Sequence, residues 1–162
     1  MNILVAYGTY SGSTKLVGER IQQKLSKLGH TVDLVDMRMA NVESFDSYDA
    51  FVLGTNTWYE KNEEGMMNGA YLNFKDTVTD KMLFKKRPVA VYALGDEIQY
   101  LQFCKSAGHL EEMVREFDGT IVTPALRISR FYFDPKSKEA EIDAWILNAL
   151  QGFTAPKVMP AA

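Results

Sequence analysis

NILVAYGTYSGST, residues 2–14, joins a short apolar run to a loop rich in glycine, serine and threonine. Residues 2–7 lack the alternation of a half-exposed strand, and such a run is typical of a strand buried on both faces of a parallel sheet. The next segment, Thr14–Leu28, carries its apolar side chains on one helical stripe, and Gly29 ends the pattern. This stretch therefore predicts a strand, a tight polar loop and a helix, the first unit of an α/β domain.

The rest of the chain repeats the alternation of strand and helix about five times in all. Further strands are expected at Thr31–Val35, Ala50–Gly54, Pro88–Leu94 and Thr120–Ile128, the last bent or at an edge because of Pro124. Helices are expected at Tyr71–Met82, Phe103–Phe117 and Lys138–Leu150. The pattern predicts an α/β fold, a three-layer α/β/α sandwich around a five-stranded parallel sheet. In such sheets ligands bind beyond the carboxyl ends of the strands, here just after Tyr7, Gly54 and Leu94.

The bulk composition is that of one globular domain. The chain has 162 residues and a formal net charge of −3, so a nucleic-acid partner is not expected. We expect a single domain at 1–153 and a flexible C-terminal tail at 154–162, TAPKVMPAA. The start of the chain does not resemble a signal peptide and no segment is apolar enough to span a bilayer, so a cytoplasmic location is expected. The single cysteine, Cys104, cannot form an internal disulfide.

The first loop, Gly8–Thr14, packs two glycines and four Ser or Thr hydroxyls into seven residues. Glycines allow the backbone N–H groups to face inward, and the following helix adds unpaired N–H groups and the positive end of its dipole. The loop therefore predicts a phosphate site without a dedicated cation. It matches neither GxxxxGK[ST] nor GxGxxG. The alternative is an ordinary helix cap within a polar turn.

Thr9-Tyr10-Ser11-Gly12-Ser13-Thr14 resembles the flavodoxin phosphate loop, [ST]-x-[ST]-G-x-T. The chain departs from that family's signature at Ala6 and Gly18, both outside the phosphate contacts. The resemblance implies a flavodoxin-like fold with strand order 2-1-3-4-5. It also implies the short-chain type, because Thr120–Phe133 leaves no room for the insertion of long-chain flavodoxins.

Two further loops carry the resemblance. The second loop, Gly54–Glu60, offers polar side chains and then Trp58, as the family does for the phosphate, the ribityl chain and one flavin face. The third loop, Leu94–Cys104, is similar to the family's GDxxYxxFC with one extra residue, so Tyr100 inherits the stacking role and Tyr59 is its rival. We expect Cys104 to be a packing residue, with a reactive thiol as the alternative. The cofactor-binding residues implied by the three loops are Thr9, Tyr10, Ser11, Gly12, Ser13, Thr14, Thr55, Asn56, Thr57, Trp58, Tyr59, Leu94, Gly95, Asp96, Tyr100 and Cys104.

The resemblance implies a low-potential electron carrier that moves single electrons on non-covalently bound FMN and has no catalytic residues and no metal. Its expected partners are a flavodoxin or ferredoxin reductase and an electron-accepting enzyme, with the chain itself a monomer. Acidic residues near the loops, Glu60, Glu63, Glu64, Asp96 and Glu97, should disfavour negative charge on the reduced flavin. Tyr59 stands where flavodoxins commonly carry glycine, so we expect weaker semiquinone stabilisation than in a Tyr59→Gly variant.

Three other hypotheses remain at this point. One is a flavodoxin-like, FMN-dependent NAD(P)H:quinone oxidoreductase, although no second domain for a nicotinamide is evident. Another is a response-regulator module, which needs an acidic cluster after the first strand where this chain has Tyr7-Gly8-Thr9. The third is a binding domain without flavin, which the colour of the purified protein would distinguish.

Overall fold

The computed structural model describes residues 1–156 of the chain. Its main sheet is parallel, with the order β2-β1-β3-β6-β7 and with β8 also paired to β6. These strands are β1 Asn2–Gly8, β2 Thr31–Asp36, β3 Ala50–Asn56, β6 Pro88–Gly95, β7 Thr120–Ile121 and β8 Leu126–Ser129. Since β7 and β8 share the outer position, the sheet has the expected order 2-1-3-4-5 with its last strand divided. The division brackets Pro124, where a bend was predicted.

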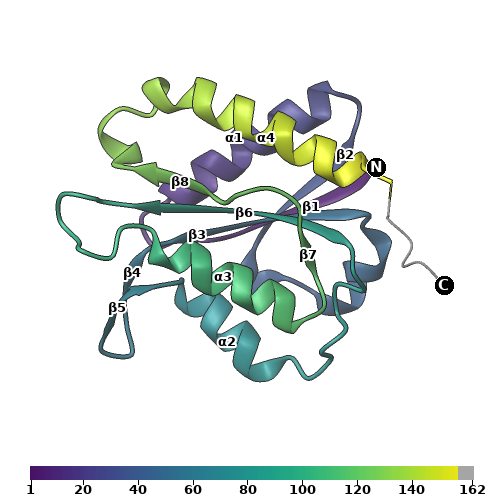
Figure 1. The fold of residues 1–162 in the computed structure, drawn as a ribbon, viewed down its shortest axis with the longest axis horizontal. Helices are drawn as coiled ribbons and strands as arrows, with labels where there is room; N and C mark the ends of the chain where they lie inside the picture. Colours follow the sequence, from purple (N-terminus) through teal and green to yellow (C-terminus); the bar gives the residue numbers. More distant parts are fainter. Residues whose placement is uncertain (157–162) are drawn as a thin grey trace.

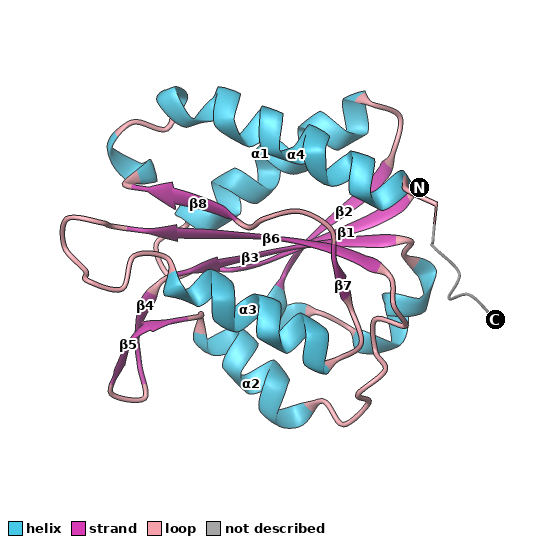
Figure 2. Ribbon diagram, in the orientation of Figure 1, coloured by secondary structure: helices cyan, strands magenta, loops and turns pink. Residues whose placement is uncertain are grey.

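Helices cover both faces of the sheet, with α1 and α4 on one side and α2 and α3 on the other (Figure 1). The α-helices are α1 Ser13–Lys27, α2 Gly69–Thr77, α3 Lys105–Glu116 and α4 Glu139–Thr154, and short 3₁₀ helices are η1 Met37–Met39, η2 Val42–Ser47, η3 Phe131–Phe133 and η4 Lys136–Lys138. The three-layer α/β/α sandwich is therefore confirmed (Figure 2).

The alternation of side chains along β1 explains why both layers form. Ile3 and Val5 pack with Val17 and Ile146 on the α1–α4 side, in one apolar cluster. Leu4 and Ala6 belong to the other cluster, on the α2–α3 side. Since successive strand residues point to opposite faces, an unbroken apolar run is what a doubly covered strand needs.

A small antiparallel hairpin follows β3 and was not predicted. It consists of β4 Trp58–Glu60 and β5 Glu63–Met66, and the two residues between the strands, Lys61 and Asn62, both have positive φ. Two consecutive positive-φ residues form the turn type that suits the twist of a hairpin. This hairpin occupies most of the segment 59–70, which from sequence alone could only be described as a loop.

Two element boundaries also differ from expectation. Helix α2 begins at Gly69, before the predicted Tyr71, because Asn68 caps it by accepting a hydrogen bond from the N–H of Ala70 at 2.9 Å. It ends at Thr77, since Val78 is extended. Helix α4 extends to Thr154, which was assigned to the tail, and residues 157–162 of that tail lie outside the described residues.

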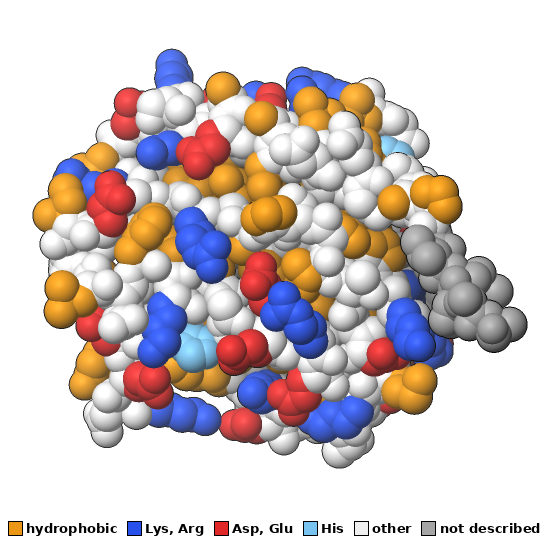
Figure 3. All heavy atoms as spheres, viewed as in Figure 1, with side chains coloured by type: hydrophobic (Ala, Val, Ile, Leu, Met, Phe, Trp, Pro, Cys, Tyr) orange, Lys and Arg blue, Asp and Glu red, His pale blue; other side chains and the backbone are white. Residues whose placement is uncertain are grey.

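Within residues 1–156, none of the helices combines the length and apolar character that a membrane span requires. On the face of the molecule seen in Figure 3, Lys and Arg side chains are mixed with Asp and Glu side chains. No patch of a single charge sign stands out on that face.

Candidate functional site

The carboxyl ends of β1, β3 and β6 meet at one edge of the sheet, beside the point where the strand order reverses between β2-β1 and β3. A cleft with a volume of about 370 Å³ lies at this edge. Its walls come from the first, second and third loops and from the connection between β8 and α4. The lining residues are Tyr10, Ser11, Ser13, Thr14, Asn56, Thr57, Trp58, Leu94, Gly95, Asp96, Gln99, Tyr100, Arg130, Phe131, Tyr132 and Phe133.

The first loop forms a cradle of free backbone donors. Gly12 precedes α1 with φ +94°, a conformation that favours glycine, and its N–H donates to Thr9 Oγ1 at 2.9 Å. Four residues of this loop that line the cleft donate no backbone hydrogen bond within residues 1–156: Tyr10, Ser11, Ser13 and Thr14. Unpaired N–H groups at the start of a 15-residue helix are suited to bind an anion.

Long-range contacts hold the first loop in place. The Tyr92 hydroxyl, on the buried strand β6, donates to the carbonyl oxygen of Thr14 at 2.9 Å. Burial raises the pKa of Tyr92, so this hydroxyl stays protonated as a donor. The Tyr10 hydroxyl donates to Glu60 and accepts from the N–H of Gly69 at 3.0 Å, which ties the loop to the hairpin and to α2.

The second loop places one unsatisfied polar group against the cleft. Asn56 Oδ1 accepts a hydrogen bond from Asn68 Nδ2 at 2.7 Å, while the buried Nδ2 of Asn56 has no partner within the described residues. A buried N–H group without a partner is costly, so its presence in a cleft wall points to an acceptor supplied from outside the chain. Thr57 makes two hydrogen bonds that hold it in place. Its N–H donates to the carbonyl oxygen of Leu94 at 2.8 Å, and its hydroxyl is hydrogen-bonded to the hydroxyl of Ser106 at 2.7 Å.

Three aromatic rings gather at the mouth of the cleft. Trp58, which is 49% exposed, has its ring centroid 6.4 Å from that of Tyr100 and 6.3 Å from that of Tyr10. The Trp58 and Tyr100 planes are tilted by 53°. A flat ring between them needs roughly 7 Å and parallel planes, because carbon atoms make contact at about 3.5 Å. The two rings are thus adjacent but do not form the two parallel walls that the sequence suggested.

Asp96 organises the third loop. Its Oδ1 accepts hydrogen bonds from the N–H groups of Ile98 at 2.9 Å and Gln99 at 3.1 Å, and its carbonyl oxygen accepts from the N–H of Tyr100 at 3.1 Å. This turn brings Tyr100 back over the cleft.

The segment Arg130–Phe133, called the RFYF segment below, forms the fourth wall and was missed from sequence. Its aromatic character was a visible signal, but only the pairing of β8 with β6 brings it to the third loop. Tyr132 is 77% and Phe133 is 69% exposed. Among the lining residues of the described range 1–156, Arg130 is the only Lys or Arg, so the acidic surroundings expected from sequence contain a cation as well.

Five of the residues implied by the resemblance lie outside the cleft walls: Thr9, Gly12, Thr55, Tyr59 and Cys104. Thr9 and Gly12 shape the first loop, and Thr55 accepts a hydrogen bond from the N–H of Asn68 at 2.8 Å. Tyr59 lies in β4, paired with Glu64. Cys104 is fully buried just before α3, and burial raises the pKa of its thiol to about 11.

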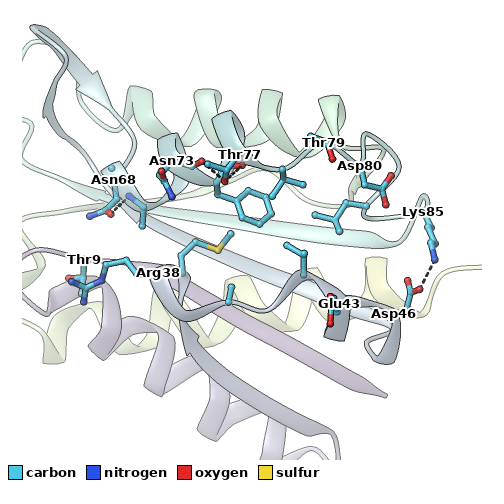
Figure 4. A pocket seen from close by; sticks show the side chains of 18 of the residues that line it. Thr9, Arg38, Glu43, Asp46, Asn68, Asn73, Thr77, Thr79, Asp80 and Lys85 are labelled. Atoms are coloured by element: carbon cyan, nitrogen blue, oxygen red, sulfur yellow. Dashed lines mark hydrogen bonds and ion pairs between the residues drawn. The ribbon is translucent and has the colours of Figure 1, made fainter.

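A second, larger groove of about 910 Å³ runs between η1–η2 and α2 (Figure 4). Thr9, Arg38 and Asn68 lie at one end and the Asp46–Lys85 ion pair, with N···O 2.7 Å, at the other. It touches the first loop only at Thr9 and Tyr10 and includes no residue of the second and third loops. We therefore place the candidate site in the smaller cleft, where all three predicted loops converge.

Comparison with known proteins points to one family. The family model described as Flavodoxin matches residues 5–145. The chain is similar to a flavodoxin of Nitratidesulfovibrio vulgaris, 25% identical over 145 residues, which cover 89% of this chain and 93% of that protein. It is similar to probable flavodoxin 2 of Bacillus subtilis, 29% identical over 140 residues, which cover 86% and 87%. The crystal structure of oxidised flavodoxin 2 from Bacillus cereus superposes with a TM-score of 0.79 at 25% identity, covering 93% of this chain and 99% of that chain.

Proposed function

This chain belongs to the flavodoxin family, and we propose that the cleft holds its FMN on the side chains and backbone groups described above. Members of this family are electron carriers that bind FMN, and they are not enzymes. The alternative of an NAD(P)H:quinone oxidoreductase is not favoured, since the similar proteins are flavodoxins.

The observation that carries the proposal is the set of backbone N–H groups at Tyr10, Ser11, Ser13 and Thr14, which have no partner in the part of the chain that the structure describes. An FMN phosphate would be held there by neutral donors and by the dipole of α1. The unpartnered Nδ2 of Asn56 offers one more donor to a phosphate or ribityl oxygen. Donors at one wall and aromatic rings at another suit a molecule with an anionic end and a flat apolar end.

FMN supplies the redox chemistry when bound. The chain orients it: the loop turn at Asp96 holds Tyr100 over the cleft, and the hydrogen bonds of Thr57 hold the loop that carries Trp58. These aromatic side chains would exclude water from the ring.

We also propose which kinds of protein exchange electrons with this chain. We expect a reductase as electron donor and an enzyme as acceptor, with the chain acting as a monomer in the cytoplasm. Exposed apolar side chains on the third loop, Ile98 at 73% and Leu101 at 96% exposed, support docking of a redox partner next to the cleft. The mixture of charges on the face seen in Figure 3 supports weak electrostatic steering.

Titration of purified protein into FMN tests the proposal. We expect quenching of FMN fluorescence, an FMN absorbance spectrum in the purified protein, and reduction in one-electron steps. Trp58→Leu should weaken binding, whereas Trp145→Phe should not. Trp145 is a buried residue of α4 outside the cleft walls, and its Nε1 donates to the carbonyl oxygen of Pro124 at 2.9 Å. Colourless protein that leaves FMN fluorescence unchanged would refute the proposal.

A further inference from the structure

Arg130 is fixed to the cleft by its backbone. It directly follows β8, has φ +51°, and donates its N–H to the carbonyl oxygen of Gly95 at 2.9 Å. Gly95 itself lines the cleft. A left-handed arginine is uncommon, and here it redirects the chain from the end of β8 into the RFYF segment.

The guanidinium is also held at the cleft. Its central carbon lies 4.2 Å from the centroid of the Phe133 ring, and its Nε lies 3.9 Å from Asp96 Oδ2. The side chain of Arg130 is 40% exposed and that of Asp96 is 22% exposed. A cation stacked on an aromatic face and set beside a partly buried carboxylate keeps its position better than a free surface arginine.

We propose that Arg130 sets the reduction potential of the bound flavin by stabilising its reduced, negatively charged form. This inference rests on the proposed function. The electron comes from the redox partner, and when no proton accompanies it the flavin ring gains one negative charge. A fixed positive charge in a partly desolvated cleft favours that added charge. The RFYF segment thereby counteracts the carboxylates around the third loop.

Asp96 limits the size of this effect. In the wild-type protein the carboxylate partly neutralises the guanidinium, so the flavin experiences an ion pair and not an isolated cation. Removing Arg130 takes away the cation and also leaves Asp96 unpaired, and both changes disfavour the reduced flavin. Removing the Asp96 charge does the opposite, because it takes away a carboxylate that disfavours the reduced flavin and also leaves Arg130 unpaired.

Potentiometric titration of the FMN-loaded protein, together with separate dissociation constants for oxidised and reduced FMN, tests the inference. We expect Arg130→Gln to weaken binding of reduced FMN relative to oxidised FMN by about tenfold, the order expected for one charge in a partly exposed site. Tenfold is a shift of about 59 mV to more negative potential for a one-electron couple. Arg130→Lys keeps the charge and should retain most of the wild-type potential.

Arg115→Gln is the matched control. It removes the same charge from α3, where Arg115 pairs with Glu111 at 3.7 Å and is not among the cleft-lining residues. Equal potentials in Arg130→Gln and Arg115→Gln would overturn the inference. If Arg130→Gln does not retain FMN through purification, the ratio of its dissociation constants for reduced and oxidised FMN, measured with added FMN, decides. A ratio about tenfold higher than in wild type supports the role of Arg130, and an unchanged ratio refutes it. Failure of the wild-type protein to bind FMN would instead refute the proposed function.

Discussion

Asn68 determines whether the Oδ1 or the Nδ2 of the Asn56 side-chain amide stays without a partner at the cleft. Asn68 Oδ1 is occupied as the cap of α2, accepting from the N–H of Ala70 at 2.9 Å, so only its Nδ2 can face Asn56. That Nδ2 donates to Asn56 Oδ1 at 2.7 Å. Within residues 1–156, Asn56 Nδ2 is consequently left as a buried donor without a partner. A helix cap thus sets the chemistry of a cleft residue.

Asn68→Asp should weaken FMN binding by about tenfold, the value of one hydrogen bond of roughly 1 to 1.5 kcal/mol. The aspartate still caps α2, but its second oxygen accepts where Asn68 donates. The Asn56 amide then turns its Nδ2 toward the aspartate and presents an acceptor to the cleft. The measurement is the FMN dissociation constant from fluorescence quenching. Asn41→Asp is the control, since Asn41 caps η2 by accepting from the N–H of Glu43 at 3.0 Å. Similar affinities for the two variants would contradict the role assigned to Asn68.

Gly54→Ala should destabilise the fold by about 3 kcal/mol, at the upper end for overpacking of a core. A Cβ at this position would lie 1.9 Å from Cζ of Tyr92, whose ring is fully buried. Urea denaturation measures the loss. Gly108→Ala, inside α3 with no heavy atom within 4 Å of its Cβ, should gain about 0.5 to 1 kcal/mol. A Gly54→Ala variant as stable as wild type would show that the approach of β3 to Tyr92 is not as close as described.

The unfolding free energy should decline above about pH 9 partly because of Cys104. The thiol has its ordinary pKa near 9.0 when unfolded, and burial raises it to about 11 in the fold. Above pH 9 the unfolded chain therefore loses a proton that the folded chain keeps, which favours unfolding by at most about 2 kcal/mol up to pH 11. Below pH 9 this contribution to stability is fully present. Denaturation of wild type and Cys104→Ala at pH 8, 9 and 10 measures it, and the variant should show the smaller decline. Parallel declines would count against burial as the cause.

Tyr59→Gly should increase the yield of one-electron-reduced flavin during stepwise reduction. Tyr59 lies in β4, paired with Glu64, and is not among the positive-φ residues. Glycine adopts a left-handed conformation at a free-energy cost roughly 1 kcal/mol lower than tyrosine does, so the Trp58–Tyr59 peptide could reorient more readily in the variant. Tyr59→Ala is the control, because it removes the same ring but keeps a Cβ. The spectra recorded during reduction measure the yield, and identical yields for the two variants would end the hypothesis.

The sequence by itself determined the layers and the anion-binding character of the first loop, and its resemblance to the flavodoxins implied the strand order and three of the four cleft walls. Apolar runs buried on both faces and the glycine- and hydroxyl-rich first loop depend on spacing along the chain, which can be read without coordinates. It also located the break at Pro124. The β4–β5 hairpin was not evident, because its turn uses Lys61 and Asn62 at positive φ instead of glycine.

Only the tertiary structure decided the fourth wall and the orientation of the polar groups. Arg130 meets Gly95 across 35 positions of sequence because β8 pairs with β6, and Asn68 meets Asn56 because the hairpin folds the chain back. Which atom of an amide faces a cleft, and whether a carboxylate has a cation beside it, depend on contacts between strands. Local periodicity carries no information on such contacts.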